Sequence, residues 1–307
     1  MKSDASKRVT SLLQRILPGR RFVIGVPFLW LTLCFLLPFL LVTRISLSEV
    51  DIRHPFGTFL TFVDHAFVWQ AKLGNYLFIL QDELYLLTYL SSLKYAAITT
   101  VLCLFLGYPF AYFMARTKAT LRPTLLMMVM LPFWTSFLLR IYAWKGILSN
   151  DGLLNTMLLD VGLISTPLQL MHTPISLVIG MVYAYLPFMI LPLYANLSKR
   201  DLRLLEAAAD LGASPWQAFW RVTVPLSRSG IIAGSMLVFI PCIGEYVIPE
   251  LLGGPETLMI GRVLWDEFFT NNDWPMASAV TVVAILLILL PLALFGKQSG
   301  PAAGEKT

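Results

Sequence analysis

The sequence predicts an all-α integral membrane protein with six transmembrane helices. Hydrophobic residues make up 57% of the 307 residues, charged residues make up only 13%, and the mean hydropathy is +0.72. Ordinary soluble domains carry roughly 25% charged residues. The apolar residues also gather in runs of about 20, a length that crosses a bilayer core as a helix. The six runs are Phe22–Val42, Leu93–Ala115, Leu125–Tyr142, Ile175–Leu197, Ile231–Leu252 and Met276–Phe295.

The connections between these runs arrange the chain as one membrane domain with polar ends. A basic lead over residues 1–21 precedes the six-helix domain at 22–296, and a polar tail at 297–307 follows it. The longest connection, residues 45–87, comes after the first run and is rich in acidic and aromatic residues. A loop of that length tends to be functional or to have structure of its own. A second polar connection, residues 198–229, separates the fourth and fifth runs.

Charge predicts how the chain is oriented in the membrane. The two ends of the chain and the connections on the same side hold 16 of the 23 basic residues but only 5 of the 18 acidic residues. That side therefore carries a net charge of +11, and the other side carries −6. Basic connections remain in the cytoplasm, so both termini and the 198–229 loop are expected there. The pI of 9.1 follows from this topology and indicates no nucleic-acid partner.

The sequence lacks the motifs of several other function classes. It has no G-x-x-x-x-G-K-[ST] phosphate loop, no G-x-S-x-G and no H-E-x-x-H, so this chain is not predicted to be an enzyme. Cys34, Cys103 and Cys242 lie inside predicted spans without metal-ligand spacing and are expected to be buried as apolar residues. We therefore expect neither a cofactor nor a metal ion in this chain.

The 198–229 loop is predicted to form two short helices joined by a glycine turn. Asp201 is suited to cap the first helix, and Gly212 fits its C′ position, where glycine adopts a left-handed conformation at least cost. Ser214 and Gln217 then have the spacing of a capping box for the second helix. Such a hairpin would project from the membrane as a compact docking surface.

Seven residues of this loop form a spaced motif. They are Glu206, Ala207, Ala208, Gly212, Val222, Val224 and Pro225. Their spacing resembles the coupling loop of permease subunits in ATP-driven (ABC-type) importers, which reads E-A-A, three residues, G, nine residues, I, one residue, L-P. Val222 replaces the usual Ile and Val224 the usual Leu, and both remain branched and apolar. The resemblance implies that Glu206, Ala207, Ala208, Gly212 and Pro225 couple the chain to a separate ATPase, which binds ATP and Mg²⁺. The alternative is a solvated helical hairpin with an Ala-rich face.

Glu245 is the leading candidate for contact with a transported solute. It lies inside the fifth predicted span, where a charged side chain costs roughly 2.5–3.5 kcal/mol and is expected to face a cavity, a partner or a substrate. Pro241 and Gly244 can interrupt the helix beside it. The alternative is an ion pair, with Arg140 or with a partner subunit, that only holds helices together. Glu250, nearer the outer end, is expected to be solvated.

Aromatic and acidic residues near the outer ends of the spans extend this candidate path. Ring faces bind ammonium groups, but interfacial belts of Trp and Tyr give an alternative explanation for each ring. The aromatic candidates are Trp134, Tyr142, Tyr183, Tyr185 and Tyr246, and the acidic candidates in the last outer connection are Asp266 and Glu267.

From about residue 22 onward, the plan of the chain resembles the type I ABC importer permease (MetI-like) fold. Within that class it is similar to the spermidine/putrescine permeases, and most to the PotH-type putrescine subunits. This similarity is carried by Leu131–Trp144, Tyr183–Met189, Val238–Pro241 and, most specifically, Gly244–Pro255.

The resemblance implies transport of polyamine, putrescine before spermidine, from periplasm to cytoplasm by alternating access. It also implies a lipid-embedded heterodimer with a second permease in the bacterial inner membrane. Two copies of a cytoplasmic ATPase and a periplasmic polyamine-binding protein would complete the assembly. One alternative keeps the permease class but changes the solute to ferric ion or sulfate. Another is a secondary transporter driven by an ion gradient, although such proteins usually show paired broken helices in two related halves.

Overall fold

The computed structural model describes residues 20–48, 60–63, 66–69, 73–201 and 203–296. The predicted basic lead at 1–21 therefore lies almost entirely outside the described residues, as does the polar tail at 297–307. The chain divides into two compact units. One comprises Met1–Tyr76 with Asp273–Val282, and the other comprises Leu77–Asn272 with Val283–Thr307. Each unit is described by itself.

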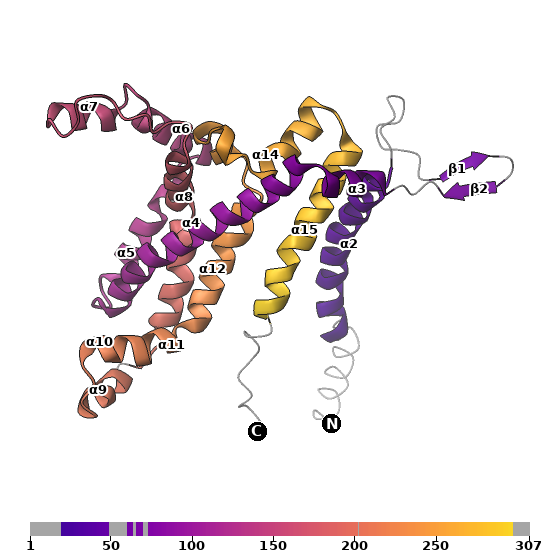
Figure 1. The fold of residues 1–307 in the computed structure, drawn as a ribbon. Coiled ribbons are helices and arrows are strands. Elements are labelled where there is room, and N and C mark those ends of the chain that lie inside the picture. Colours follow the sequence, from indigo (N-terminus) through magenta and orange to yellow (C-terminus); the bar gives the residue numbers. More distant parts are fainter. Residues whose placement is uncertain (1–19, 49–59, 64–65, 70–72, 202, 297–307) are drawn as a thin grey trace, which may run out of the picture. The chain divides into compact units, whose positions relative to one another are not determined.

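The first unit contains a long apolar helix and a small β-hairpin (Figure 1). Strands β1 (Leu60–Val63) and β2 (Ala66–Trp69) pair antiparallel, so the long connection that follows the first run contains strand as well as helix. Both strands are rich in β-branched and aromatic residues, which favour strands. The side chain of Asn75 donates to the carbonyls of Ser46 and Ser48 at 3.1 and 3.0 Å and ties the connection back to the end of the first helix. The helices of this unit are α2 (Arg20–Ser46), the start of α3 (Gly74–Gln81) and the first part of α15 (Trp274–Gly296).

The second unit is built on α4, α8 and α12, which pack against one another (Figure 1). Besides the remainders of α3 and α15, its α-helices are α4 (Glu83–Arg116), α5 (Arg122–Met130), α6 (Phe137–Leu148), α7 (Leu153–Asp160), α8 (Pro174–Leu197), α9 (Arg203–Asp210), α10 (Pro215–Ala218), α11 (Val224–Leu226), α12 (Arg228–Ile243), α13 (Val247–Leu252) and α14 (Ile260–Trp265). Short 3₁₀ segments, η1 (Leu131–Trp134) and η3 (Pro255–Thr257), and π-helical segments, η2 (Phe219–Thr223) and η4 (Asp266–Thr270), join them.

Glycines allow the three long helices to approach closely. A Cβ added at Gly234 of α12 would lie 2.8 Å from the Sδ of Met189 on α8 and 3.2 Å from its carbonyl oxygen. A Cβ at Gly107 of α4 would lie 3.1 Å from the Cγ of the same Met189, which is fully buried. Small residues at such crossings are the usual means of packing helices within a membrane, where dispersion contacts replace the hydrophobic effect.

The predicted spans are less regular than six straight helices. Three described helices are long and apolar enough to cross a membrane. The number of possible spans rises to five if each of two bent helix pairs is counted as one span. The expected third span, Leu125–Tyr142, bends by 86° after η1, where Thr135 is extended. The expected fifth span, Ile231–Leu252, stops at Ile243, because Gly244 follows and the chain leaves the helical path. The six-span count is therefore not reached among the described residues.

We expect the substitution Gly234→Val to loosen the packing of α12 on α8. Overpacking of this kind costs about 1–3 kcal/mol, so the temperature of unfolding of the purified protein in detergent should fall. Gly146→Val is the matched control, because a Cβ at that helical position meets no atom within 4 Å. An equal fall for both variants would contradict the proposed contact and point to the cost of valine in a helix.

Candidate functional site

The polar loop after α8 folds as the predicted helical hairpin. The Oδ1 of Asp201 accepts a hydrogen bond from the backbone N–H of Arg203 at 3.0 Å, as expected for a cap of α9. Gly212 has a φ of +79°, and its N–H donates to the carbonyl of Ala209 at 2.8 Å. The N–H of Ala213 donates to the carbonyl of Ala208 at 3.0 Å. These two bonds form a Schellman motif and explain why glycine is needed there.

The second helix of the hairpin also begins as the sequence predicts. The Oγ of Ser214 accepts from the N–H of Gln217 at 3.3 Å, and the Gln217 side chain accepts from the N–H of Ser214 at 3.1 Å. Pro215 occupies the first helical turn. The segment then widens into the π-helix η2, which the sequence did not predict. The capping box fixes the point at which this helix starts.

Side chains fasten the hairpin and the start of α12 to α4 and to the end of α8. Arg200, three residues after α8, donates to the carbonyl of Leu226, and Asn196 of α8 donates to the Oγ of Ser229 on α12 at 2.6 Å. Ser227, just before α12, shares a 2.8 Å hydrogen bond with the hydroxyl of Tyr108 on α4. The rings of Tyr108 and Tyr112 both meet the ring of Phe219 edge-on, at centroid distances of 5.6 and 5.5 Å. A force on the hairpin would therefore act directly on α4, α8 and α12.

The motif residues lie mostly on the free side of this hairpin. Glu206, Ala207, Gly212 and Pro225 are exposed, and Ala208 is half-buried. Among the described residues the Glu206 carboxylate has no hydrogen-bond or ion-pair partner. Val222 instead faces inward and lines a cavity of about 100 Å³ together with Leu205 of α9. The apolar end of the motif thus packs the hairpin, while the E-A-A end remains available to a partner.

The break between α12 and α13 is organised by the Glu245 side chain. Its Oε1 accepts from the backbone N–H groups of Val247 and Ile248, at 3.0 and 3.4 Å, and so satisfies the start of α13. Its Oε2 accepts a hydrogen bond from the hydroxyl of Tyr185 on α8. Both carboxylate oxygens therefore have partners within this chain. The negative charge also lies at the positive end of the α13 dipole.

Arg140 is not the partner of Glu245, contrary to the alternative raised from the sequence. Its guanidinium lies over the ring of Phe133, 4.9 Å from the centroid, and 5.7 Å from that of Phe137. Its Nε is buried without a hydrogen-bond partner among the described residues. The bend between η1 and α6 places both rings beside the arginine, and this could not be deduced from the sequence.

The structure brings only some of the aromatic candidates to Glu245. Tyr185 is buried, with its hydroxyl on the carboxylate, and Tyr246 stacks on Trp265 with ring centroids 4.4 Å apart. Tyr183 is half-buried against Trp144 on α6, at a centroid distance of 5.4 Å. The remaining two, Trp134 and Tyr142, are 79% and 55% exposed, as interfacial or partner-facing residues would be.

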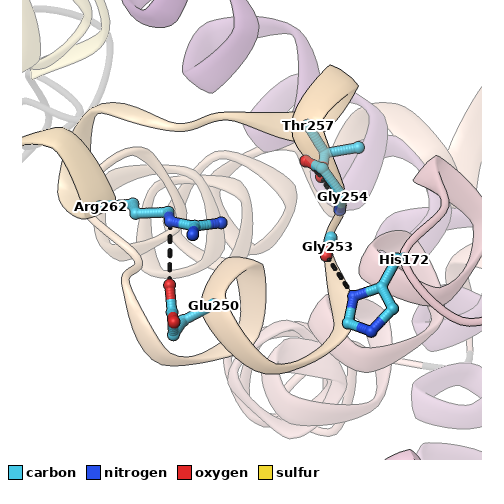
Figure 2. Close-up of polar contacts among 6 residues, drawn as sticks. All are labelled: His172, Glu250, Gly253, Gly254, Thr257 and Arg262. Atoms are coloured by element: carbon cyan, nitrogen blue, oxygen red, sulfur yellow. Dashed lines mark hydrogen bonds and ion pairs between the residues drawn. The ribbon is translucent and has the colours of Figure 1, made fainter.

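Of the two acidic candidates in the last connection, Glu267 is held by side-chain hydrogen bonds. Glu267 accepts from the hydroxyl of Tyr85 at 2.6 Å and from the side chain of Asn271 at 2.9 Å. Asp266 precedes it at the start of η4 and is half-buried. Glu250 is not simply solvated, because it forms an ion pair of 2.9 Å with Arg262 of α14 (Figure 2). Sequence reasoning missed this pair, since the two residues are on separate helices.

The Gly-Gly-Pro run after α13 packs closely against the backbone of His172, just before α8. Figure 2 shows the ring of His172, whose Nδ1 lies 2.9 Å from the carbonyl oxygen of Gly253. A Cβ at Gly254 would collide with the carbonyl of His172, and the Gly254 N–H donates to the Oγ1 of Thr257 at 2.7 Å. The Oγ of Ser176 donates to the carbonyl of Leu252 at 2.8 Å. These contacts hold the C-terminal end of α13 in a fixed position.

The chain matches the family of binding-protein-dependent transport system inner membrane components over residues 103–297. It belongs to this family, and its several apolar helices are those of a multi-pass inner-membrane permease. One relative is the spermidine/putrescine transport system permease protein PotB of Haemophilus influenzae, which is 41% identical over 88% of this chain and 91% of the relative. The PotB of Escherichia coli K12 is 42% identical over 88% and 94%.

Two solved structures share the fold. The first is a bacterial ABC transporter involved in the import of the acidic polysaccharide alginate, with a TM-score of 0.66, 16% identity and coverage of 98% of this chain and 99% of that one. The second is the alginate transporter in complex with its alginate pentasaccharide-bound periplasmic protein, with a TM-score of 0.64, 16% identity and coverage of 91% and 94%. The predicted ABC importer permease fold is therefore confirmed.

We expect Tyr185→Phe and Glu245→Gln to be energetically coupled. A hydrogen bond to a charged group contributes about 1.5–3 kcal/mol, so each single variant should lower the free energy of unfolding in detergent, and the double variant should cost less than their sum. Tyr183→Phe is the matched control, since its hydroxyl has no hydrogen bond within the described part of the chain. Strictly additive losses would contradict the coupling.

Proposed function

We propose that this chain is the transmembrane permease subunit of an ATP-driven importer for polyamines. The observation that carries the substrate class is the identity of more than 40% to spermidine/putrescine permeases over 88% of the chain. The acidic residue at the break in α12–α13 supports a cationic substrate, because a carboxylate in the membrane can balance an ammonium group. We propose putrescine as the first substrate and spermidine as the second, on the strength of the Gly244–Pro255 run.

Energy would come from a separate ATPase, of which two copies would bind ATP and Mg²⁺ and dock on the permease pair. Glu206, Ala207, Ala208, Gly212 and Pro225 would form the contact on this chain. The bonds that tie the hairpin to α4, α8 and α12 would pass the closure of the ATPases to the spans. The second permease subunit would complete the transport path as a heterodimer, in alternating access.

The outer parts of the site would receive substrate from a periplasmic polyamine-binding protein. In the orientation predicted from the basic residues, both termini and the hairpin would lie in the cytoplasm, and α13 would lie on the periplasmic side. Glu245 and Tyr246 would line the path, while Tyr185 would hold the carboxylate in place from behind. The other path residues proposed are Trp134, Tyr142, Tyr183, Asp266 and Glu267.

We expect Glu206→Lys to abolish uptake while the protein stays inserted in the membrane. The substitution reverses an exposed charge without removing a contact inside the chain, so the fold should be kept and only the docking lost. Asp210→Lys is the matched control, because Asp210 is exposed on the same helix but outside the motif. Uptake at the normal rate by the inserted Glu206→Lys protein would refute the coupling role.

The substrate is tested by uptake of labelled putrescine, with labelled spermidine in parallel. The comparison is between cells lacking this gene, in a background without a second polyamine system, and the same cells with the gene restored. Loss and recovery of putrescine uptake is the expected result. Recovery of spermidine uptake alone would correct the order of the two substrates. No change in either would overturn the polyamine assignment and leave the permease class intact.

A further inference from the structure

A groove with two charged side chains in a mostly apolar lining lies between the first turns of α4 and the η3 segment. It has a volume of about 450 Å³, and its polar walls include Ser91, Lys94 and Glu256. Lys94 and Glu256 are exposed and have no ion-pair partner within the described part of the chain. The Oγ of Ser91 is buried and has no hydrogen-bond partner among the described residues. The groove thus holds one positive charge, one negative charge and an unsatisfied hydroxyl.

An apolar groove begins further along α4, at Ala97. It has a volume of about 390 Å³ and is lined by Ala97 and Val101 of α4 and by Met236 and Phe239 of α12. Residues three and four apart share one face of a helix, so Lys94, Ala97 and Val101 follow one another down the same side of α4.

A third groove of about 490 Å³ continues from the second. It shares Val101 and Ile231 with the second groove and extends to Phe105, Trp216 and Trp220. One side of α4 therefore carries charged side chains at one end and apolar grooves further along. This arrangement is complementary to the polar head and apolar tails of an amphiphile.

We propose that these grooves bind a phospholipid with an ethanolamine headgroup. The Lys94 ammonium would pair with the phosphate, and the Glu256 carboxylate would pair with the ethanolamine ammonium. The acyl chains would lie in the apolar groove lined by Ala97, Val101, Met236 and Phe239. Lys94 stands at the start of the predicted span Leu93–Ala115, so the headgroup is at the membrane surface. Its assignment to the outer leaflet rests on the proposed orientation.

Charge complementarity selects this lipid over the other occupants of such a surface. A glycerol headgroup carries a phosphate but no cation, so it would leave Glu256 unpaired beside a second negative charge. An apolar helix of a partner subunit would cover Lys94 and Glu256 without pairing either, and buried unpaired charges are costly. A zwitterionic headgroup satisfies both charges at once.

The test measures which lipid the purified full transporter retains. The complex is reconstituted in nanodiscs of equal phosphatidylethanolamine and phosphatidylglycerol, extracted, and its retained lipid quantified by native mass spectrometry. We expect phosphatidylethanolamine to be favoured about fivefold, which corresponds to about 1 kcal/mol. Glu256→Lys should reverse the preference toward phosphatidylglycerol, and Glu256→Gln should abolish it.

Glu83→Lys is the matched control, because Glu83 is exposed on the same helix and does not line the groove. An unchanged ratio in Glu256→Lys, an equal change in Glu83→Lys, or no retained lipid in the native complex would each overturn the proposal. Because retention is measured without transport, failure here leaves the proposed import of polyamines untouched, and failed uptake leaves the lipid site untouched.

Discussion

The close packing of α8 against α4 and α12 is the interaction on which the second unit depends. Met189 sits where glycines of both neighbouring helices allow the backbones to approach. The other important contacts lie at or just beyond the two ends of α8: Asn196 holds the start of α12, Arg200 holds the hairpin, and Ser176 holds α13. Dispersion contacts between closely spaced backbones stabilise this packing, because the hydrophobic effect does not drive helices together within lipid. A wider spacing of these helices would uncouple the hairpin from the contacts between α8 and α13.

A second constraint is that the membrane core holds no water, so each polar backbone group there needs a hydrogen-bond partner within the protein. The break after α12 exposes the first N–H groups of α13, and Glu245 accepts two of them. Tyr185 then completes the carboxylate. The same carboxylate therefore serves structure and, in the proposed function, attraction of a cation. Its fixed orientation is an advantage for binding, since no side-chain freedom is lost when an ammonium group approaches.

The two ends of α12 connect the proposed functions. The hairpin lies before its first residue, and the Glu245 break follows its last, after 16 residues or about 24 Å of helix. Because α12 is short and held at both ends, a tilt of the hairpin would move the Glu245 break as well. Tyr108, which bonds to Ser227 at the start of this helix, brings α4 into the same movement. Docking of an ATPase and exposure of the carboxylate would then be two results of one rigid displacement.

The sequence by itself determined the membrane class, the hairpin and its caps, because these depend on local chemistry. Gly212 and Ser214 dictate their own backbone conformations, and the E-A-A spacing lies within one loop. Only the tertiary structure decided the partners of the charged groups. Glu245 pairs with Tyr185 and not with Arg140, and Glu250 pairs with Arg262. The partners in each pair are far apart in the chain or on separate helices. The physical reason is that such pairs depend on where helices bend and cross, and these positions are set by packing across many residues at once.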